Sequence, residues 1–179
     1  MAEERHDKES AGEKLEHGYD RMIQRVHEAF QHAGERGISL RQALDRAREA
    51  ATKVDGLTRE EAHKVGEWVR RDLHDAGDYL AGTGHELRDW LYMDLELIEY
   101  RLFDLFAQAA DQTKLALLQF EEAALHADEL HSGEVTGPGT LECRNCGELL
   151  HFKKAGHIPP CPRCHQSVFE RKKARSDAG

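Results

Sequence analysis

The amino-acid sequence predicts a mainly α-helical protein, an elongated antiparallel helical bundle or coiled coil followed by a small C-terminal β module. Three observations carry this prediction. The chain of 179 residues is polar, with 33% charged residues, 39% hydrophobic residues and only four prolines, which favours helices. Apolar residues recur in it at the three- and four-residue spacing of amphipathic helices. Its four cysteines all lie in one short stretch near the C-terminus.

Four helices are expected, and the last three have explicit start signals. Each signal is a capping box, in which a Ser or Thr side chain and a Gln or Glu side chain three residues later bond each other's free backbone N–H groups. The boxes pair Ser39 with Gln42, Thr58 with Glu61, and Thr83 with Glu86. Each box follows a helix-breaking glycine. The resulting helices are expected near 12–33, 39–54, 58–81 and 84–131.

The first three of these helices each have one apolar face, which predicts that they pack against each other. The first face is Leu15, Tyr19, Met22, Val26, Phe30 and Ala33. The second is Ala43, Leu44, Ala47, Ala50 and Ala51, and the third is Ala62, Val65, Val69, Leu73, Ala76 and Leu80.

The expected fourth helix, 84–131, would dominate the shape, because its length at a rise of about 1.5 Å per residue is roughly 70 Å. Its main apolar stripe is Leu87, Leu91, Leu95, Ile98, Leu102, Leu105, Phe106, Ala109, Ala116, Phe120, Ala123, Ala127 and Leu130. A weaker opposite stripe is Met93, Tyr100, Phe103, Ala107, Leu118 and Leu125. Two stripes indicate contacts on two sides, with other helices of the chain or with a second copy in a homo-oligomer.

Charge divides the chain into two parts. Residues 1–139 hold 17 Lys and Arg against 30 Asp and Glu, whereas residues 140–179 hold 8 against 4. The change coincides with a stretch rich in glycine, which predicts a linker over 132–139 between a helical domain, 12–131, and a small domain, 140–173. We expect disordered tails over 1–11 and 174–179.

The cysteines form two C-x2-C pairs separated by fourteen residues: Cys143, Cys146, Cys161 and Cys164. Each two-residue gap permits a tight turn, or knuckle, that directs two thiolates toward one point. Two knuckles complete a tetrahedral shell of four sulfurs, for which Zn2+ is the usual occupant and iron the alternative. Because no ligand position stays open, we expect one structural zinc ion and no catalytic residue. Short strands near 140–142, 148–153 and 166–171 complete a zinc ribbon.

Two other functions remain open for the ribbon. Four thiolates could release the metal on oxidation, which is the thiol or zinc redox-sensor alternative. Nucleic acid is the second alternative, through the basic side chains Arg144, Lys153, Lys154, Arg163, Arg171, Lys172 and Lys173. Four thiolates on a divalent ion lower the formal charge of the ribbon by two, so its net positive charge falls short of that expected of a nucleic-acid binder, which is not favoured.

The chain lacks the motifs of several enzyme classes, including a nucleophile elbow, a phosphate-binding glycine loop and an HExxH pair, so we expect no enzyme. No apolar run approaches the roughly 18 residues that a membrane span needs, and no membrane is expected as a partner. The N-terminus lacks the basic start and apolar stretch of a secretory signal, so we expect the protein to be cytoplasmic.

Several stretches resemble the YbeL-like zinc-ribbon-containing proteins of Gram-negative bacteria. They are LTREEAHKVGEWVRRDL at 57–73, ADQTK at 110–114, HSGEV with two following glycines at 131–139, CRNC at 143–146 and CPRCHQSVFERK at 161–172. The resemblance implies zinc on the four cysteines and implies no activity. We therefore expect a zinc-binding protein-interaction adaptor or regulator, in which helices dock to an unidentified protein partner and the ribbon presents a rigid surface.

Overall fold

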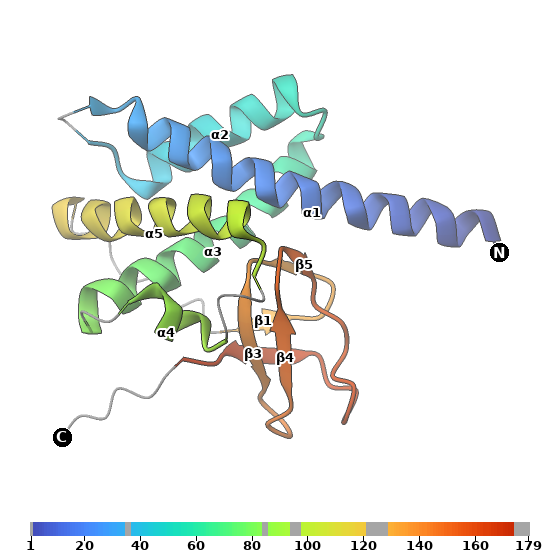
Figure 1. Cartoon of the computed structure of the whole chain (residues 1–179). Helices are drawn as coiled ribbons and strands as arrows, with labels where there is room; N and C mark the ends of the chain where they lie inside the picture. Colours follow the sequence, from blue (N-terminus) through green and yellow to red (C-terminus); the bar gives the residue numbers. More distant parts are fainter. Residues whose placement is uncertain (1, 35–36, 84–85, 94–97, 121–128, 174–179) are drawn as a thin grey trace, which may run out of the picture.

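The computed structural model describes residues 2–34, 37–83, 86–93, 98–120 and 129–173, and it combines a helical part with a small β part (Figure 1). The helices are α1 (Ala2–Gln31), α2 (Leu40–Val54), α3 (Arg59–Thr83), α4 (Leu87–Leu91) and α5 (Tyr100–Phe120). The strands are β1 (Leu130–His131), β2 (Val135–Thr136), β3 (Gly139–Cys143), β4 (Leu149–Phe152), β5 (Gly156–His157) and β6 (Val168–Arg171).

The helical part is built on the apolar faces that the sequence predicted. Helices α1, α2, α3 and α5 pack against each other around one core. Tyr19, Met22 and Val26 of α1 are buried there, as are Val65, Val69 and Leu73 of α3. Two predicted capping boxes are present. Gln42 N–H donates to Ser39 Oγ at 3.2 Å, and Glu61 N–H donates to Thr58 Oγ1 at 3.1 Å.

The predicted single helix over 84–131 is wrong. Helix α4 ends at Leu91, where Tyr92 has a left-handed backbone with φ of 51°, and the chain resumes as α5 at Tyr100. Trp90 of α4 stacks on Phe106 of α5 with ring centroids 5.3 Å apart, so the two helices share a core without being continuous. Apolar periodicity reports which residues are buried, and two helices folded onto one core satisfy it as well as one long helix.

The ends of this region also differ from the prediction. Leu130, at the end of the predicted stripe, lies in strand β1, and Thr83, predicted to start the fourth helix, is instead the last residue of α3, where its Oγ1 donates to the carbonyl of Tyr79. Residues 94–97 and 121–128, with the predicted stripe residues Leu95, Ala123, Leu125 and Ala127, lie outside the described residues, as do the side chains of Leu118 and Phe120. Within the described residues, the end of α4 at Leu91 means that the predicted long coiled coil is not confirmed.

The β part consists of two antiparallel sheets. One has the strand order β1-β6-β3-β4, and the other pairs β2 with β5. Strands β3, β4 and β6 lie where the sequence predicted them. A small core of Leu130, Leu141, Ile158 and Phe169 lies beside the cysteines.

The prediction that residues 132–139 form a linker between two separate domains is wrong. It contains β2, and residues 135–139 are buried, mostly against the helical part. At the other end of the chain, α1 begins at Ala2, within the segment 1–11 for which a disordered tail was predicted; the residues there are mostly good helix formers. The predicted tail 174–179 lies outside the described residues. Within the described ranges, no helix is long and apolar enough to cross a membrane.

Candidate metal centre

The four cysteines lie on two knuckles with the same backbone hydrogen bonds. In the first knuckle, Gly147 N–H donates to the carbonyl of Cys143, and Cys143 N–H donates to the carbonyl of Glu148. In the second, His165 N–H donates to the carbonyl of Cys161, and Cys161 N–H donates to the carbonyl of Gln166. Both turns require a left-handed residue after the second cysteine. Gly147 has φ of 72° and His165 has φ of 59°, so the histidine adopts a conformation that glycine adopts more readily.

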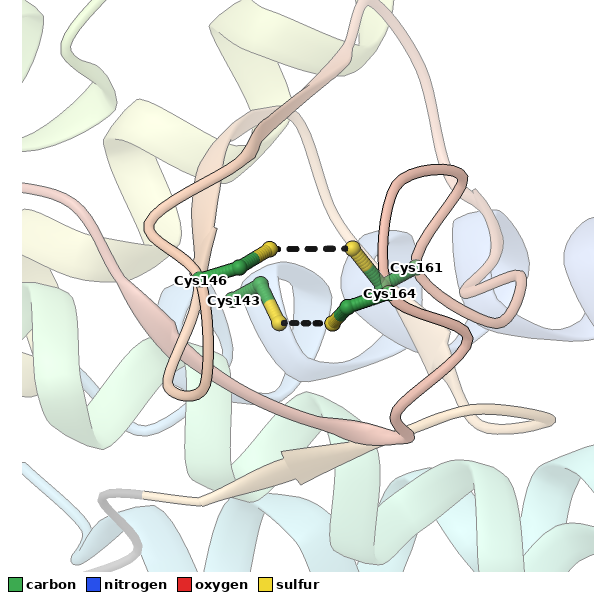
Figure 2. A group of neighbouring side chains, drawn as sticks. All are labelled: Cys143, Cys146, Cys161 and Cys164. Atoms are coloured by element: carbon green, nitrogen blue, oxygen red, sulfur yellow. Dashed lines mark hydrogen bonds between the residues drawn. The ribbon is translucent and has the colours of Figure 1, made fainter.

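The knuckles bring the thiols together from two sides (Figure 2). Cys143 Sγ lies 3.6 Å from Cys164 Sγ, and Cys146 Sγ lies 3.6 Å from Cys161 Sγ. All four sulfurs lie within 4.8 Å of one another. Four ligands about 2.3 Å from a tetrahedral zinc ion are about 3.8 Å apart, so these sulfurs fit such an ion. They are too far apart for disulfides, whose sulfurs are about 2.05 Å apart, and all four are free thiols.

The thiols differ in how readily they ionise. Hydrogen bonds from the backbone N–H of Gln166 and the side chain of Asn145 stabilise the Cys164 thiolate and lower its pKa to about 6. The N–H of Glu148 favours the thiolate of Cys146 in the same way, but burial and its hydrogen bonds to the other three cysteines raise its pKa to about 12. Because zinc binds thiolates, metal binding must release protons from this cluster.

The histidines near the cysteines do not join this cluster in the described structure. His151 is exposed, and its Nδ1 lies 2.9 Å from Thr140 Oγ1. The ring of His157 lies against α1, with Nε2 3.2 Å from the carbonyl of Gly12. Within the described residues, the four cysteines are the one group of metal-ligating side chains close enough together to hold an ion.

Four of the seven basic side chains that were named as possible nucleic-acid contacts are already paired with acidic side chains. Arg144 pairs with Glu129 and Glu170, Lys172 pairs with Glu142 and Lys173 pairs with Asp75. Arg171 pairs with Asp72 of α3, and its side chain is only 4% exposed. The other three, Lys153, Lys154 and Arg163, are exposed.

The β part docks onto the helices through a buried polar cluster that sequence analysis missed. Its centre is Asp72 of α3, which is 1% exposed. Asp72 Oδ2 accepts hydrogen bonds from the Tyr19 hydroxyl at 2.7 Å, from Gly137 N–H at 2.8 Å and from Thr136 Oγ1 at 3.1 Å. Its other oxygen, Oδ1, lies 3.3 Å from Arg171 Nη2 and accepts from Arg71 Nε at 3.0 Å. The carboxylate therefore joins α1, α3 and two parts of the β region.

Two arginines extend this polar cluster. Arg71 donates to Glu134 at 2.5 Å and to the carbonyl of Val135 at 3.1 Å. Arg171 donates to Thr136 Oγ1 at 2.7 Å and to the carbonyl of Pro138 at 3.1 Å, while its guanidinium carbon lies 4.4 Å from the ring centre of Trp90. Two guanidinium groups thus face two carboxylates, and the charges of the cluster balance.

Burial and pairing act in opposite directions on these groups. Burial alone would raise the pKa of Asp72, but Arg71 and Arg171 outweigh it and the pKa of Asp72 is lowered. Burial likewise opposes the charge of Arg71, yet Asp72 and Glu134 raise its pKa. The pKa of Tyr19 is raised well above its usual value by burial and by the adjacent Asp72 carboxylate. Asp72 and Arg71 therefore stay charged despite their burial because oppositely charged side chains lie beside them.

The sequence feature that could have indicated this cluster is a charged residue within the apolar pattern of a helix. Asp72 falls between Val69 and Ala76 on the buried face of α3, where a lone acid without a partner would be costly. Its partners are up to 99 residues away in sequence, and no local pattern names them.

The chain is similar to one protein family and to several curated proteins. A family model described as a zinc-ribbon containing domain matches residues 24–173. Proteins named "Uncharacterized protein YbeL" from Escherichia coli strain K12 and from strain O6:H1 are each 30% identical to the chain over 78 residues, which is 44% of this chain and 49% of the relative. The chain thus spans about half the length of the curated relatives it matches. No solved structure matches the chain. Neither the family description nor these names specify an enzymatic activity.

Proposed function

Because the chain belongs to the family of zinc-ribbon containing domains, whose model spans residues 24–173, we propose that it is a zinc-binding, non-enzymatic adaptor for a protein partner. Cys143, Cys146, Cys161 and Cys164 hold one zinc ion, and the ribbon so formed is carried on a bundle of helices in the cytoplasm. The observation that carries the zinc assignment is the cluster of four free thiols within 4.8 Å of one another.

A structural role for the ion follows from the ligand set. Four thiolates fill a tetrahedral shell and leave no position for water or substrate. When bound, the ion supplies the positive charge that lets four sulfur anions share one site. The chain supplies the two knuckles, with backbone N–H groups of Glu148 and Gln166 directed at the thiols.

A protein partner is favoured over nucleic acid by the charges on the ribbon. Arg144, Arg171, Lys172 and Lys173 already have acidic partners within the chain, which leaves Lys153, Lys154 and Arg163 among the described basic side chains of the ribbon for a phosphate backbone. Three cations fall short of the clustered basic face of a nucleic-acid binder. The helical part also presents apolar side chains to solvent, with Tyr100 82% exposed and Leu115 53% exposed on α5.

Metal analysis and affinity capture together test this function. The purified full-length chain is expected to contain zinc, and a variant with Cys161→Ser and Cys164→Ser is expected to contain none. Capture from native lysate with the wild-type chain should return a reproducible protein that withstands nuclease treatment. Co-purification of nucleic acid, or capture that depends on it, would support the nucleic-acid alternative and contradict the adaptor.

A further inference from the structure

Strand β6 connects the metal centre directly to the helical part. It begins four residues after Cys164, and its Phe169 pairs in register with Cys143 and is fully buried beside the thiols. Two residues further on, Arg171 contacts Asp72 and Trp90 of the helical part. A displacement of β6 therefore changes both the second knuckle and the buried polar cluster.

The two parts of the molecule differ in how much they can hold themselves together. The core of the β part consists of six buried residues, two of which are cysteines. So small a core does not fold without its metal. The helical part has a much larger core, drawn mainly from α1, α2, α3 and α5, to which the β part contributes Val135 and Ala155.

The contact between the two parts depends on folded strands. Asp72 receives the N–H of Gly137 and the hydroxyl of Thr136 only while β2 holds its place, and it receives Arg171 only while β6 does. A second contact joins the Glu99 N–H, just before α5, to the carbonyl of Lys153 in the β part, at 3.0 Å. Unfolding of the strands removes all of these partners together.

We propose that the Arg71–Asp72–Arg171 cluster is a metal-dependent latch: the ribbon docks on the helical part while the four thiols hold their ion, and undocks when the ion is lost. Undocking leaves the helices folded and uncovers Asp72 and Asp75 on α3, together with the neighbouring Trp90 of α4. By linkage, the same coupling means that weakening the latch weakens metal binding. This inference rests on the proposed zinc binding.

Trp90 provides a reporter on the helical side of the contact. It is fully buried, Arg171 lies over its ring, and its Nε1 donates to Asp75, which also pairs with Lys173 of the ribbon. Loss of docking exposes this ring to water and shifts its emission to longer wavelength. The chain has one other tryptophan, Trp68, so a Trp68→Phe background isolates the signal.

The experiment uses full-length Trp68→Phe protein and three variants in that background. Asp72→Asn removes the charge at the centre of the latch, and Tyr19→Phe removes one hydrogen bond to it. Lys172→Gln is the matched control, because Lys172 lies next to Arg171 on β6 but pairs with Glu142 of the ribbon itself. Zinc affinity is measured by competition with a chromogenic chelator, Trp90 emission is followed as zinc is removed, and circular dichroism reports helix content.

We expect zinc removal to shift Trp90 emission while helix content is largely retained, and zinc to restore the original emission. Asp72→Asn should weaken zinc binding about tenfold, within the usual range of coupling between linked sites, and Tyr19→Phe by a smaller factor in the same direction. Lys172→Gln should leave zinc affinity unchanged.

The outcomes separate the latch from zinc binding itself. If the starting protein binds no zinc, the proposed function fails. If it binds zinc but Trp90 emission does not respond to zinc removal, and Asp72→Asn and Tyr19→Phe bind zinc as tightly as the control, the latch is overturned while zinc binding stands. Should Asp72→Asn not fold, Tyr19→Phe decides between the two results.

Discussion

Asp72 in the middle of α3 and Arg171 at the end of β6 form an ion pair, with Oδ1 and Nη2 3.3 Å apart and both side chains almost fully buried. Because Arg171 follows the second cysteine knuckle by seven residues, this pair places the candidate metal centre in a fixed position against the helices. The ribbon is thus docked on the helical part through a charged contact at the centre of the interface.

The first prediction concerns the charge at this contact. Asp72→Asn leaves Arg71 and Arg171 buried without their shared carboxylate, and we expect a loss of about 3 kcal/mol in the free energy of unfolding. Urea denaturation measures it. Lys53→Gln is the control, since it removes an exposed ion pair with Glu49 and should not move the denaturation midpoint. Equal midpoints for the two variants would show that the buried pair does not hold the parts together.

The second prediction concerns the close approach of Gly137 to α1. A Cβ at residue 137 would lie 2.7 Å from the Tyr19 hydroxyl oxygen, and the next nearest atoms are 3.4 Å away. Gly137→Ala should therefore destabilise the protein by about 1–3 kcal/mol, as overpacking does in other buried sites.

Tyr19→Phe removes the oxygen that the new methyl group would meet. Gly137→Ala should consequently cost less in the Tyr19→Phe background than in the wild type, which a double-mutant cycle of urea denaturations would reveal. Strict additivity of the two substitutions would mean that Gly137 and Tyr19 do not meet as described.

These residues show where sequence reasoning succeeds and where it ends. The paired cysteines predicted their cluster because a C-x2-C turn is local, and the capping boxes at Ser39 and Thr58 are local as well. The glycines of 132–139 were interpreted as a linker because composition alone does not distinguish a linker from a closely packed segment. In the structure, Gly133 and Gly139 have positive φ, and Gly137 is packed against Tyr19.

The prediction of one long helix over 84–131 was wrong for a related reason. Leu87 and Leu130, at the two ends of the predicted apolar stripe, are both buried, yet the chain leaves the helix at Tyr92. Tyrosine carries no strong signal for a left-handed turn. The ion pair between Asp72 and Arg171 was likewise beyond local patterns, because its two members belong to different predicted domains.

The third prediction concerns the pH dependence of stability at Asp20. This carboxyl borders a cavity of about 220 Å³ between α1 and the start of α5, and burial together with Glu99 raises its pKa from 3.8 to about 6. The folded state thus binds the proton more tightly than the unfolded state. The contribution of Asp20 to stability is therefore greatest below about pH 4 and is lost as the pH rises through about 6.

Asp20→Asn should remove this pH dependence and stabilise the protein at pH 7. Allowing for solvent screening of a partly exposed group, we expect a gain of about 1 kcal/mol at pH 7 and little change at pH 4. Thermal unfolding of both proteins at the two pH values measures it. A variant that is less stable than the wild type at pH 7 would contradict the assignment.

The fourth prediction compares the two knuckles. Gly147 and His165 occupy equivalent left-handed positions, where a residue with a Cβ costs roughly 1–2 kcal/mol more than glycine. Gly147→Ala should weaken zinc retention, although its Cβ would meet nothing closer than 3.7 Å. His165→Gly should retain zinc at least as well as the wild type. Competition with a chelator ranks the three proteins, and a tighter Gly147→Ala variant would contradict the equivalence of the turns.

The metal content of the purified full-length chain, measured by atomic emission together with protein concentration, shows whether the four cysteines bind zinc. We predict one zinc ion per chain, with none in a variant carrying Cys161→Ser and Cys164→Ser and no change in one carrying Lys172→Gln. A chain that binds no zinc when refolded with it under reducing conditions, or whose zinc survives loss of both cysteines, would contradict the assignment.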